Sequence, residues 1–160
     1  MNCNNITDNV ATFVHHLDLS TISEDILSQA KRCVIDNVGA MLGGLSTKAS
    51  QIVRQIDFDK ETSGKSSLFG TNSKVSIGQA VFANCISASS MDIDDGHFLG
   101  GHPGSIITPS TLAIAEHYSI SGKSFIEAII VGYEIAIRAI NTVSGAGSGT
   151  GLGGTYGVAG

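Results

Sequence analysis

The sequence has few charged residues and particularly few basic ones. Charged residues make up 14% of its 160 residues, and its nine lysines and arginines are scattered along a chain of net charge −5. Nucleic acids and anionic membrane surfaces are bound by clustered basic side chains, so we expect neither as a partner. The hydrophobic share of 42% and the lack of a low-complexity polar tract argue for a chain that folds.

Disulfide pairs, a signal peptide and an uninterrupted apolar run are also lacking. Cys3, Cys33 and Cys85 are odd in number and far apart, which is typical of small core residues in a reducing compartment. The N-terminus has neither a basic start nor an apolar run, and charged residues interrupt the longest apolar stretch, residues 125–140. We therefore expect a cytoplasmic protein without a membrane span.

Helical periodicity dominates the rest of the chain. Thr21 and Glu24 form a capping-box pattern, and apolar residues then recur every three or four positions until Gly43 and Gly44. The polar residues 57–76 predict a loop with at most one short extended piece. Helices are expected over residues 7–17, 21–44, 76–91, 103–117 and 124–143. The sequence thus predicts an all-α fold, with a helical domain over residues 1–144.

Residues 145–160 are expected to form a glycine-rich loop. This segment contains Gly149-x-Gly151-x-x-Gly154, the spacing of a dinucleotide-binding fingerprint. That motif needs a strand before it and a helix after it, whereas here a long helix precedes it. A flexible or substrate-contacting loop is the better interpretation. The helix over residues 124–143 is apolar on most sides, which indicates that the chain is an incomplete part of a larger body.

The segment from residue 91 to residue 104 carries the most chemistry. It reads Met91-Asp-Ile-Asp-Asp-Gly-His97 and then Gly101-His-Pro-Gly104, so that three carboxylates and two imidazoles fall within eleven residues. An EF-hand calcium loop is excluded because its glycine is misplaced and Pro103 occupies the twelfth position. A transition-metal site using His97, His102 and a carboxylate is geometrically possible, but His-x4-His is a weak ligand spacing. We predict no metal.

Proton transfer fits this segment better. His102 directly precedes Pro103 and should lie at the mouth of a helix, whose unpaired amides favour an anionic substrate group. Intervening glycines allow Asp92 to return beside it. A carboxylate facing an imidazole is a usable base or orienting pair for a carboxylic acid substrate. The alternative is that His102 merely caps the helix and the aspartates are solvated.

Several segments resemble a known family. They are Ala83-Asn84, Met91-Asp-Ile-Asp-Asp-Gly96, Gly101-His-Pro-Gly-Ser105 and Leu112-Ala-Ile-Ala-Glu116, supported by residues 26–44, 122–138 and 153–157. Together they resemble the signature of the MmgE/PrpD family, which includes 2-methylcitrate dehydratase, cis-aconitate decarboxylase and iminodisuccinate epimerase. The resemblance covers essentially the whole chain.

The resemblance implies an N-terminal portion of the MmgE/PrpD helical domain, within a longer enzyme that usually forms homodimers. It implies a lyase that uses neither cofactor nor metal and acts on a small di- or tricarboxylic acid. The enzyme would abstract a proton next to a carboxylate, and the overall reaction would be dehydration or decarboxylation. Asp92 and His102 would be catalytic, and the substrate-binding residues would be Gly96, His97, Ser105 and Thr155. The partners would be the substrate and a second copy or the missing C-terminal part, and the isolated chain is expected to be inactive.

One departure from the family leaves the substrate open. Gly96 stands where the decarboxylase and dehydratase branches carry threonine, and His97 either substitutes for that hydroxyl or faces solvent. An epimerase or isomerase of the same family is one alternative. A non-catalytic helical interaction module or an inactive truncated product is another, and the module predicts exposed apolar surface on the helix at residues 124–143.

Overall fold

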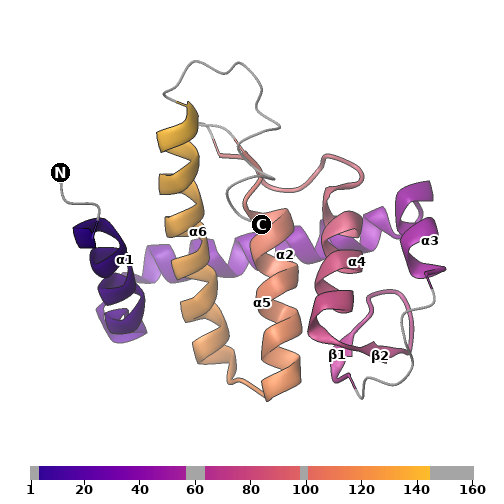
Figure 1. Ribbon diagram of the computed structural model, residues 1–160, viewed down its shortest axis with the longest axis horizontal. Coiled ribbons are helices and arrows are strands. Elements are labelled where there is room, and N and C mark those ends of the chain that lie inside the picture. The colour runs from indigo at the N-terminus through magenta and orange to yellow at the C-terminus, as the bar shows by residue number, and fades with distance from the viewer. Residues whose placement is uncertain (1–3, 57–63, 98–100, 145–160) are drawn as a thin grey trace.

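The computed structural model describes residues 4–56, 64–97 and 101–144, which are mainly helical (Figure 1). The helices are α1 (Asn4–His16), α2 (Glu24–Gly44), α3 (Lys48–Arg54), α4 (Ile77–Ser89), α5 (Gly104–Tyr118) and α6 (Gly122–Ser144). Strands β1 (Ser66–Ser67) and β2 (Lys74–Val75) form a short antiparallel hairpin. The predicted all-α class is confirmed, while α3 and β2 were not predicted. The predicted glycine-rich loop, residues 145–160, lies outside the described residues.

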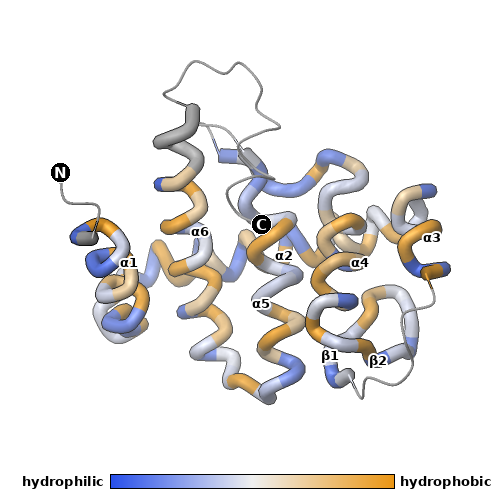
Figure 2. The backbone as a smooth tube through the Cα atoms, viewed as in Figure 1, coloured by the Kyte–Doolittle hydropathy of each residue, from blue (hydrophilic) through white to orange (hydrophobic). Residues whose placement is uncertain are grey.

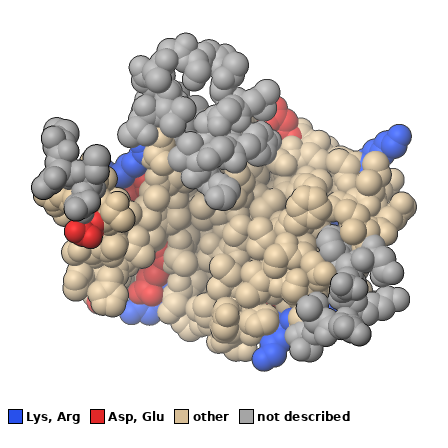
Figure 3. Space-filling model, viewed as in Figure 1, with Lys and Arg blue, Asp and Glu red and all other residues tan. Residues whose placement is uncertain are grey.

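Helix α2 is the platform on which the other long helices pack. It contacts α4, α5 and α6, and α5 lies between α4 and α6 and contacts both. Figure 1 shows α2 running across these three helices, with α1 set to one side. None of the described helices is long and apolar enough to cross a membrane. The face shown in Figure 3 is largely uncharged, with its charged side chains near the edges.

A side-chain cap defines where α4 begins, whereas α2 begins without one. Ser76 caps α4 as predicted, and Gln79 completes a reciprocal capping box. The prediction that Thr21 caps α2 is wrong, because the N-cap is Ser23. Thr21 instead ends a 3-10 turn (Leu19–Thr21), where its hydroxyl donates to the carbonyl of Asp18 at 2.7 Å. Because this local hydrogen bond competes with the capping geometry, the helix begins two residues later than predicted.

Small side chains allow the helices to approach closely. A Cβ added at Gly44, the last residue of α2, would lie 1.8 Å from the carbonyl oxygen of Ser87 on α4, so this crossing requires glycine. The buried apolar side chains are mostly alanines: Ala30, Ala40, Met41, Val53, Leu68, Ala80, Ala83, Ala88, Ala113, Ala115, Ile129 and Ala136. Close backbone contact therefore replaces the interdigitation of large side chains in much of this core.

Large apolar side chains are exposed on several helices, but not within residues 122–139 of α6. The exposed ones include four on α1, which are Ile6, Val10, Phe13 and Val14. Figure 2 shows that α1 carries both hydrophobic and hydrophilic residues. Within residues 122–139 the large apolar side chains are buried or half-buried. The exposed apolar surface that a non-catalytic module would present on α6 is therefore not found on that part of the helix.

Two polar side chains fix the hairpin to the helices. The Asn84 amide of α4 donates to the carbonyl of Ser67 at 2.9 Å and accepts from the amide of Phe69 at 3.0 Å. Glu116 of α5 accepts from the amide and hydroxyl of Ser67 at 2.5 and 2.6 Å, and from Lys74 at 3.2 Å. Burial alone would raise the pKa of Glu116, but these hydrogen bonds outweigh it and hold the pKa below its ordinary value.

Replacing Glu116 tests this anchor. Because the folded-state pKa is lowered, the ionised carboxylate stabilises the fold above the ordinary glutamate pKa, and this contribution disappears as the pH falls through the folded-state value. We expect Glu116→Gln to lower the free energy of unfolding by about 1–2 kcal/mol at pH 7 and by progressively less in acid. Urea unfolding from pH 3 to pH 8 measures this.

Glu134→Gln is the matched control, since Glu134 forms an exposed i,i+4 pair with Arg138 on α6. Such pairs contribute about 0.5 kcal/mol or less. Equal losses in the two variants, or a Glu116→Gln loss that does not change with pH, would contradict the assignment.

Candidate active site

The loop between α4 and α5 carries the predicted site. After α4 ends, the amide of Asp92 donates to the carbonyl of Ser89 at 3.2 Å, and Asp92 itself adopts a left-handed backbone with φ of 54°. Gly101 has φ of 89°, and its carbonyl accepts from the amide of His97 at 3.1 Å. These bends turn the chain back, so that His102 at the start of α5 returns to the end of α4.

Two aspartates meet the imidazole of His102. Its Nε2 lies 3.8 Å from Oδ1 of Asp92, and its Nδ1 lies 3.4 Å from Oδ2 of Asp94. The exposed fraction of the side chain is 87% for Asp92, 40% for His102 and 1% for Asp94. The structure thus brings Asp92 and His102 together, as the sequence predicted. The cluster reaches from solvent to the protein interior.

The other predicted site residues are placed unevenly around this cluster. Ser105 is buried, and its hydroxyl donates to the carbonyl of His102 at 3.0 Å. A Cβ added at Gly96 would lie 3.8 Å from Cε1 of His102, which is ordinary van der Waals contact. His97 is half-buried near the turn. Thr155 lies outside the described residues.

The prediction singled out Asp92 among the three aspartates and missed Asp94. One signal in the sequence favours Asp94. In an extended run, alternate side chains point to the same side, so Asp92 and Asp94 are expected to face one way and Asp95 the other. In the structure Asp92 and Asp94 both lie near His102, and Asp95 contacts other residues. The run is not extended throughout, however, because the backbone at Asp92 is left-handed.

The environment of Asp94 favours its protonated form. Burial raises the pKa of the Asp94 carboxyl, and the negative charge of Asp95 adds to this, while hydrogen bonding with Ser105 and the nearby His102 work in the opposite direction. A buried carboxyl beside an imidazole is a recognised feature of functional sites.

Asp95 faces a second polar group that the sequence did not reveal. Its Oδ2 accepts from the hydroxyl of Tyr133 on α6 at 2.7 Å, and its Oδ1 accepts from Nδ2 of Asn37 on α2 at 3.1 Å. Asn37 also donates to the Tyr133 oxygen, at 3.1 Å. Burial raises the pKa of the Tyr133 phenol, and the charge of Asp95 raises it further. Tyr133 therefore keeps its proton and acts as a donor.

Three described side chains are close enough to hold a cation together. Ligand atoms of Asp92, Asp94 and His102 all lie within 4.8 Å of one another. Carboxylate oxygen and imidazole nitrogen are ligands for divalent metals, and the same groups are general acids and bases. His97, considered as a ligand from the sequence, does not belong to this group among the described residues.

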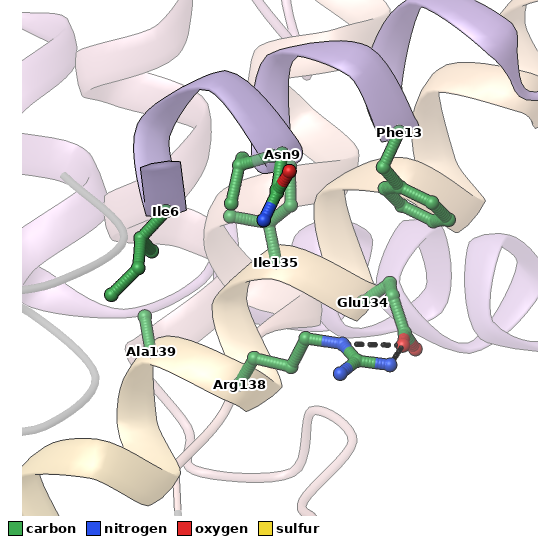
Figure 4. A pocket seen from close by; sticks show the side chains of 8 residues that line it. Ile6, Asn9, Phe13, Glu134, Ile135, Arg138 and Ala139 are labelled. Atoms are coloured by element: carbon green, nitrogen blue, oxygen red, sulfur yellow. Dashed lines mark hydrogen bonds and ion pairs between the residues drawn. The ribbon is translucent and has the colours of Figure 1, made fainter. Parts of the chain in front are cut away.

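A separate cavity of about 590 Å³ lies between α1 and α6. Figure 4 shows Ile6, Asn9 and Phe13 of α1 opposite the α6 residues, with Glu134 and Arg138 hydrogen-bonded to each other. None of the predicted site residues that the structure describes lines this cavity, whose walls are mainly apolar. It is therefore distinct from the Asp92–Asp94–His102 cluster.

Comparison with known proteins identifies the family. The MmgE/PrpD N-terminal domain matches residues 8–160. The chain belongs to the MmgE/PrpD family. It is similar to human cis-aconitate decarboxylase, with 27% identity over 141 residues, which are 85% of this chain and 29% of that protein. It is also similar to the cis-aconitate decarboxylase-like protein oryM of Aspergillus oryzae, with 28% identity over 150 residues, 89% of this chain and 31% of that protein.

The cis-aconitate decarboxylase of Mus musculus is similar as well, with 25% identity over 138 residues, which cover 83% of this chain and 28% of that protein. The chain thus spans less than a third of the length of these relatives. The matched MmgE/PrpD domain includes the whole loop that carries Asp92, Asp94 and His102.

Two glycines near the site provide a matched pair of substitutions. A Cβ at Gly104 would lie 2.0 Å from Asp95 Oδ1, 2.1 Å from Asn37 Nδ2 and 2.3 Å from the Tyr133 oxygen, whereas Gly96 has room for one. We expect Gly104→Ala to lower the free energy of unfolding by about 3 kcal/mol. Gly96→Ala should change it by about 0.5 kcal/mol or less. Thermal and urea unfolding measure both, and a well-tolerated Gly104→Ala would contradict the packing.

Asp94→Asn tests the burial of that carboxyl. Its raised pKa means that the folded state binds the proton more tightly than the unfolded state, so wild-type stability falls as the pH rises from about 4 through the folded-state pKa. Asparagine has no such loss, and the stability of Asp94→Asn relative to wild type should increase over that range. Asp36→Asn, on the exposed face of α2, controls for the removal of one charge. A pH-independent difference for Asp94→Asn would show that the carboxyl titrates normally.

Proposed function

We propose that this chain carries part of the active site of an MmgE/PrpD-type lyase that acts on a small di- or tricarboxylic acid. The convergence of Asp92, Asp94 and His102 where α5 begins carries the proposal. The named relatives are cis-aconitate decarboxylases, which favours decarboxylation of an unsaturated tricarboxylic acid as the reaction. Dehydration, as by a 2-methylcitrate dehydratase, would use the same groups.

The geometry supports a role for each member of the cluster. The buried carboxyl of Asp94 faces Nδ1 of His102 and orients the imidazole, so that Nε2 is the nitrogen directed toward Asp92 and the exposed side. His102 Nε2 and Asp92 would then exchange the proton with the substrate. In other acid–base sites, too, a carboxylate orients the imidazole that acts as the base.

The position at the N-terminus of α5 also suits an anionic substrate. The first amides of α5, at Gly104 and Ser105, have no partners within their own helix turn, and a helix N-terminus attracts carboxylate groups. In dehydration, the cluster would remove a proton from the carbon next to a carboxylate and deliver a proton to the departing hydroxyl, which leaves as water. In decarboxylation, the electron pair of the broken carbon–carbon bond stays with the substrate as CO2 leaves, and the cluster would donate a proton to carbon.

An assay with two acids tests the proposal. The protein is incubated with cis-aconitate and with 2-methylcitrate, alone and together with a polypeptide supplying the remaining length of the relatives. We expect turnover only with that polypeptide present, and at least a ~100-fold loss of kcat/KM for Asp92→Asn and His102→Gln. Chromatography of the products and release of CO2 distinguish decarboxylation from dehydration.

His15→Gln, on an exposed position of α1, is the control and should keep wild-type activity. Turnover that survives both Asp92→Asn and His102→Gln would remove these residues from the mechanism. Lack of turnover of either acid by the complemented wild-type protein would refute the proposed lyase activity on these acids.

A further inference from the structure

Asp95 belongs to the same loop as the cluster but faces away from it. Its two carboxylate oxygens are bonded to Tyr133 of α6 and Asn37 of α2, at 2.7 and 3.1 Å. Neither of these helices contributes a side chain to the Asp92–Asp94–His102 cluster. Asp95 therefore links the loop to α6 and α2 through hydrogen bonds.

We propose that Asp95, Tyr133 and Asn37 are positioning residues of the candidate active site. They hold loop residues 90–97 and the first turn of α5 in the one arrangement in which both aspartates meet His102. The inference rests on the proposed function, in which this cluster exchanges a proton with the substrate. None of the three residues contacts the reacting groups through its own side chain in the described contacts.

The donors to Asp95 are neutral and are themselves firmly held. Asn37 is completely buried, and its amide nitrogen also donates to the carbonyl of Cys33 at 2.8 Å within α2. The Tyr133 hydroxyl accepts from the Asn37 amide and donates to the Asp95 carboxylate. A carboxylate held by neutral donors on two packed helices keeps its place without depending on a mobile basic side chain.

The junction also lies directly against α5. Gly104 is two residues after His102, and its missing side chain leaves the space that Asp95, Asn37 and Tyr133 occupy. Asp95 is covalently next to Asp94 on the other side. A displacement of Asp95 would therefore move both Asp94 and His102. A misplacement of about 1 Å in a catalytic group can reduce the rate by about a hundredfold.

Tyr133→Phe is the most direct test, because it removes one hydroxyl and keeps the ring. Tyr118→Phe is the matched control: Tyr118 is 67% exposed at the end of α5. The first readout is hydrogen exchange of the amides in residues 92–97, compared with amides in the middle of α4. We expect loop exchange to accelerate about tenfold or more in Tyr133→Phe, with α4 unchanged.

The second readout is the kinetics of the complemented enzyme. For Tyr133→Phe we expect kcat to fall about tenfold or more while KM changes less than about threefold, since loosened catalytic groups affect the reacting atoms more than binding. Tyr118→Phe should behave as wild type. Asp95→Asn, which keeps an oxygen able to accept from Tyr133, is the second variant if Tyr133→Phe does not fold, and it should accelerate exchange in the same residues.

The outcomes separate this inference from the proposed function. Wild-type exchange in residues 92–97 of both variants, or an equal acceleration in α4, would overturn the positioning role. A wild-type protein that turns over neither acid would refute the proposed function, while the exchange comparison would still decide whether Tyr133 and Asp95 hold the loop. A fall in kcat together with selective loop exchange supports both.

Discussion

The candidate site depends on one group of hydrogen bonds, which joins the loop before α5 to helices α2 and α6 beside Gly104. Asp95, Asn37 and Tyr133 fill the space beside Gly104, and any larger residue there would collide with all three. Because buried polar groups are costly when left unpaired, this small network specifies a single arrangement of the loop. The two aspartates that face His102 are held on the opposite side of the same short segment.

This division of labour between neighbouring aspartates has an electrostatic consequence. Asp94 is buried and the adjacent Asp95 is half-buried. Burial makes ionisation of Asp94 less favourable, and the charge on Asp95 adds to this effect. Asp95 accepts hydrogen bonds from two neutral donors, whereas Asp94 faces the imidazole of His102. The two neighbouring aspartates therefore have different partners, and only Asp94 lies beside a group that acid–base chemistry can use.

The fold around this site is built for close approach more than for large buried side chains. Alanines and Gly44 let α2 and α4 pack tightly, and the Asn84 and Glu116 side chains bind the hairpin to α4 and α5. The helices therefore present the loop on a rigid support. Large apolar side chains remain exposed on α1 and α2 of a chain that covers less than a third of its MmgE/PrpD relatives.

The sequence by itself determined the helices and the place of the site. Periodicity predicted five of the six described helices, Ser76 marked the start of α4, and the spacing of Asp92 and His102 predicted their approach, because these features depend on local geometry. The tertiary structure decided the hairpin, the burial of Asp94 and the link from Asp95 to Tyr133 and Asn37. Residues 38 and 58 positions apart carry no mutual signal in one sequence, since only packing of α2, α5 and α6 brings them together.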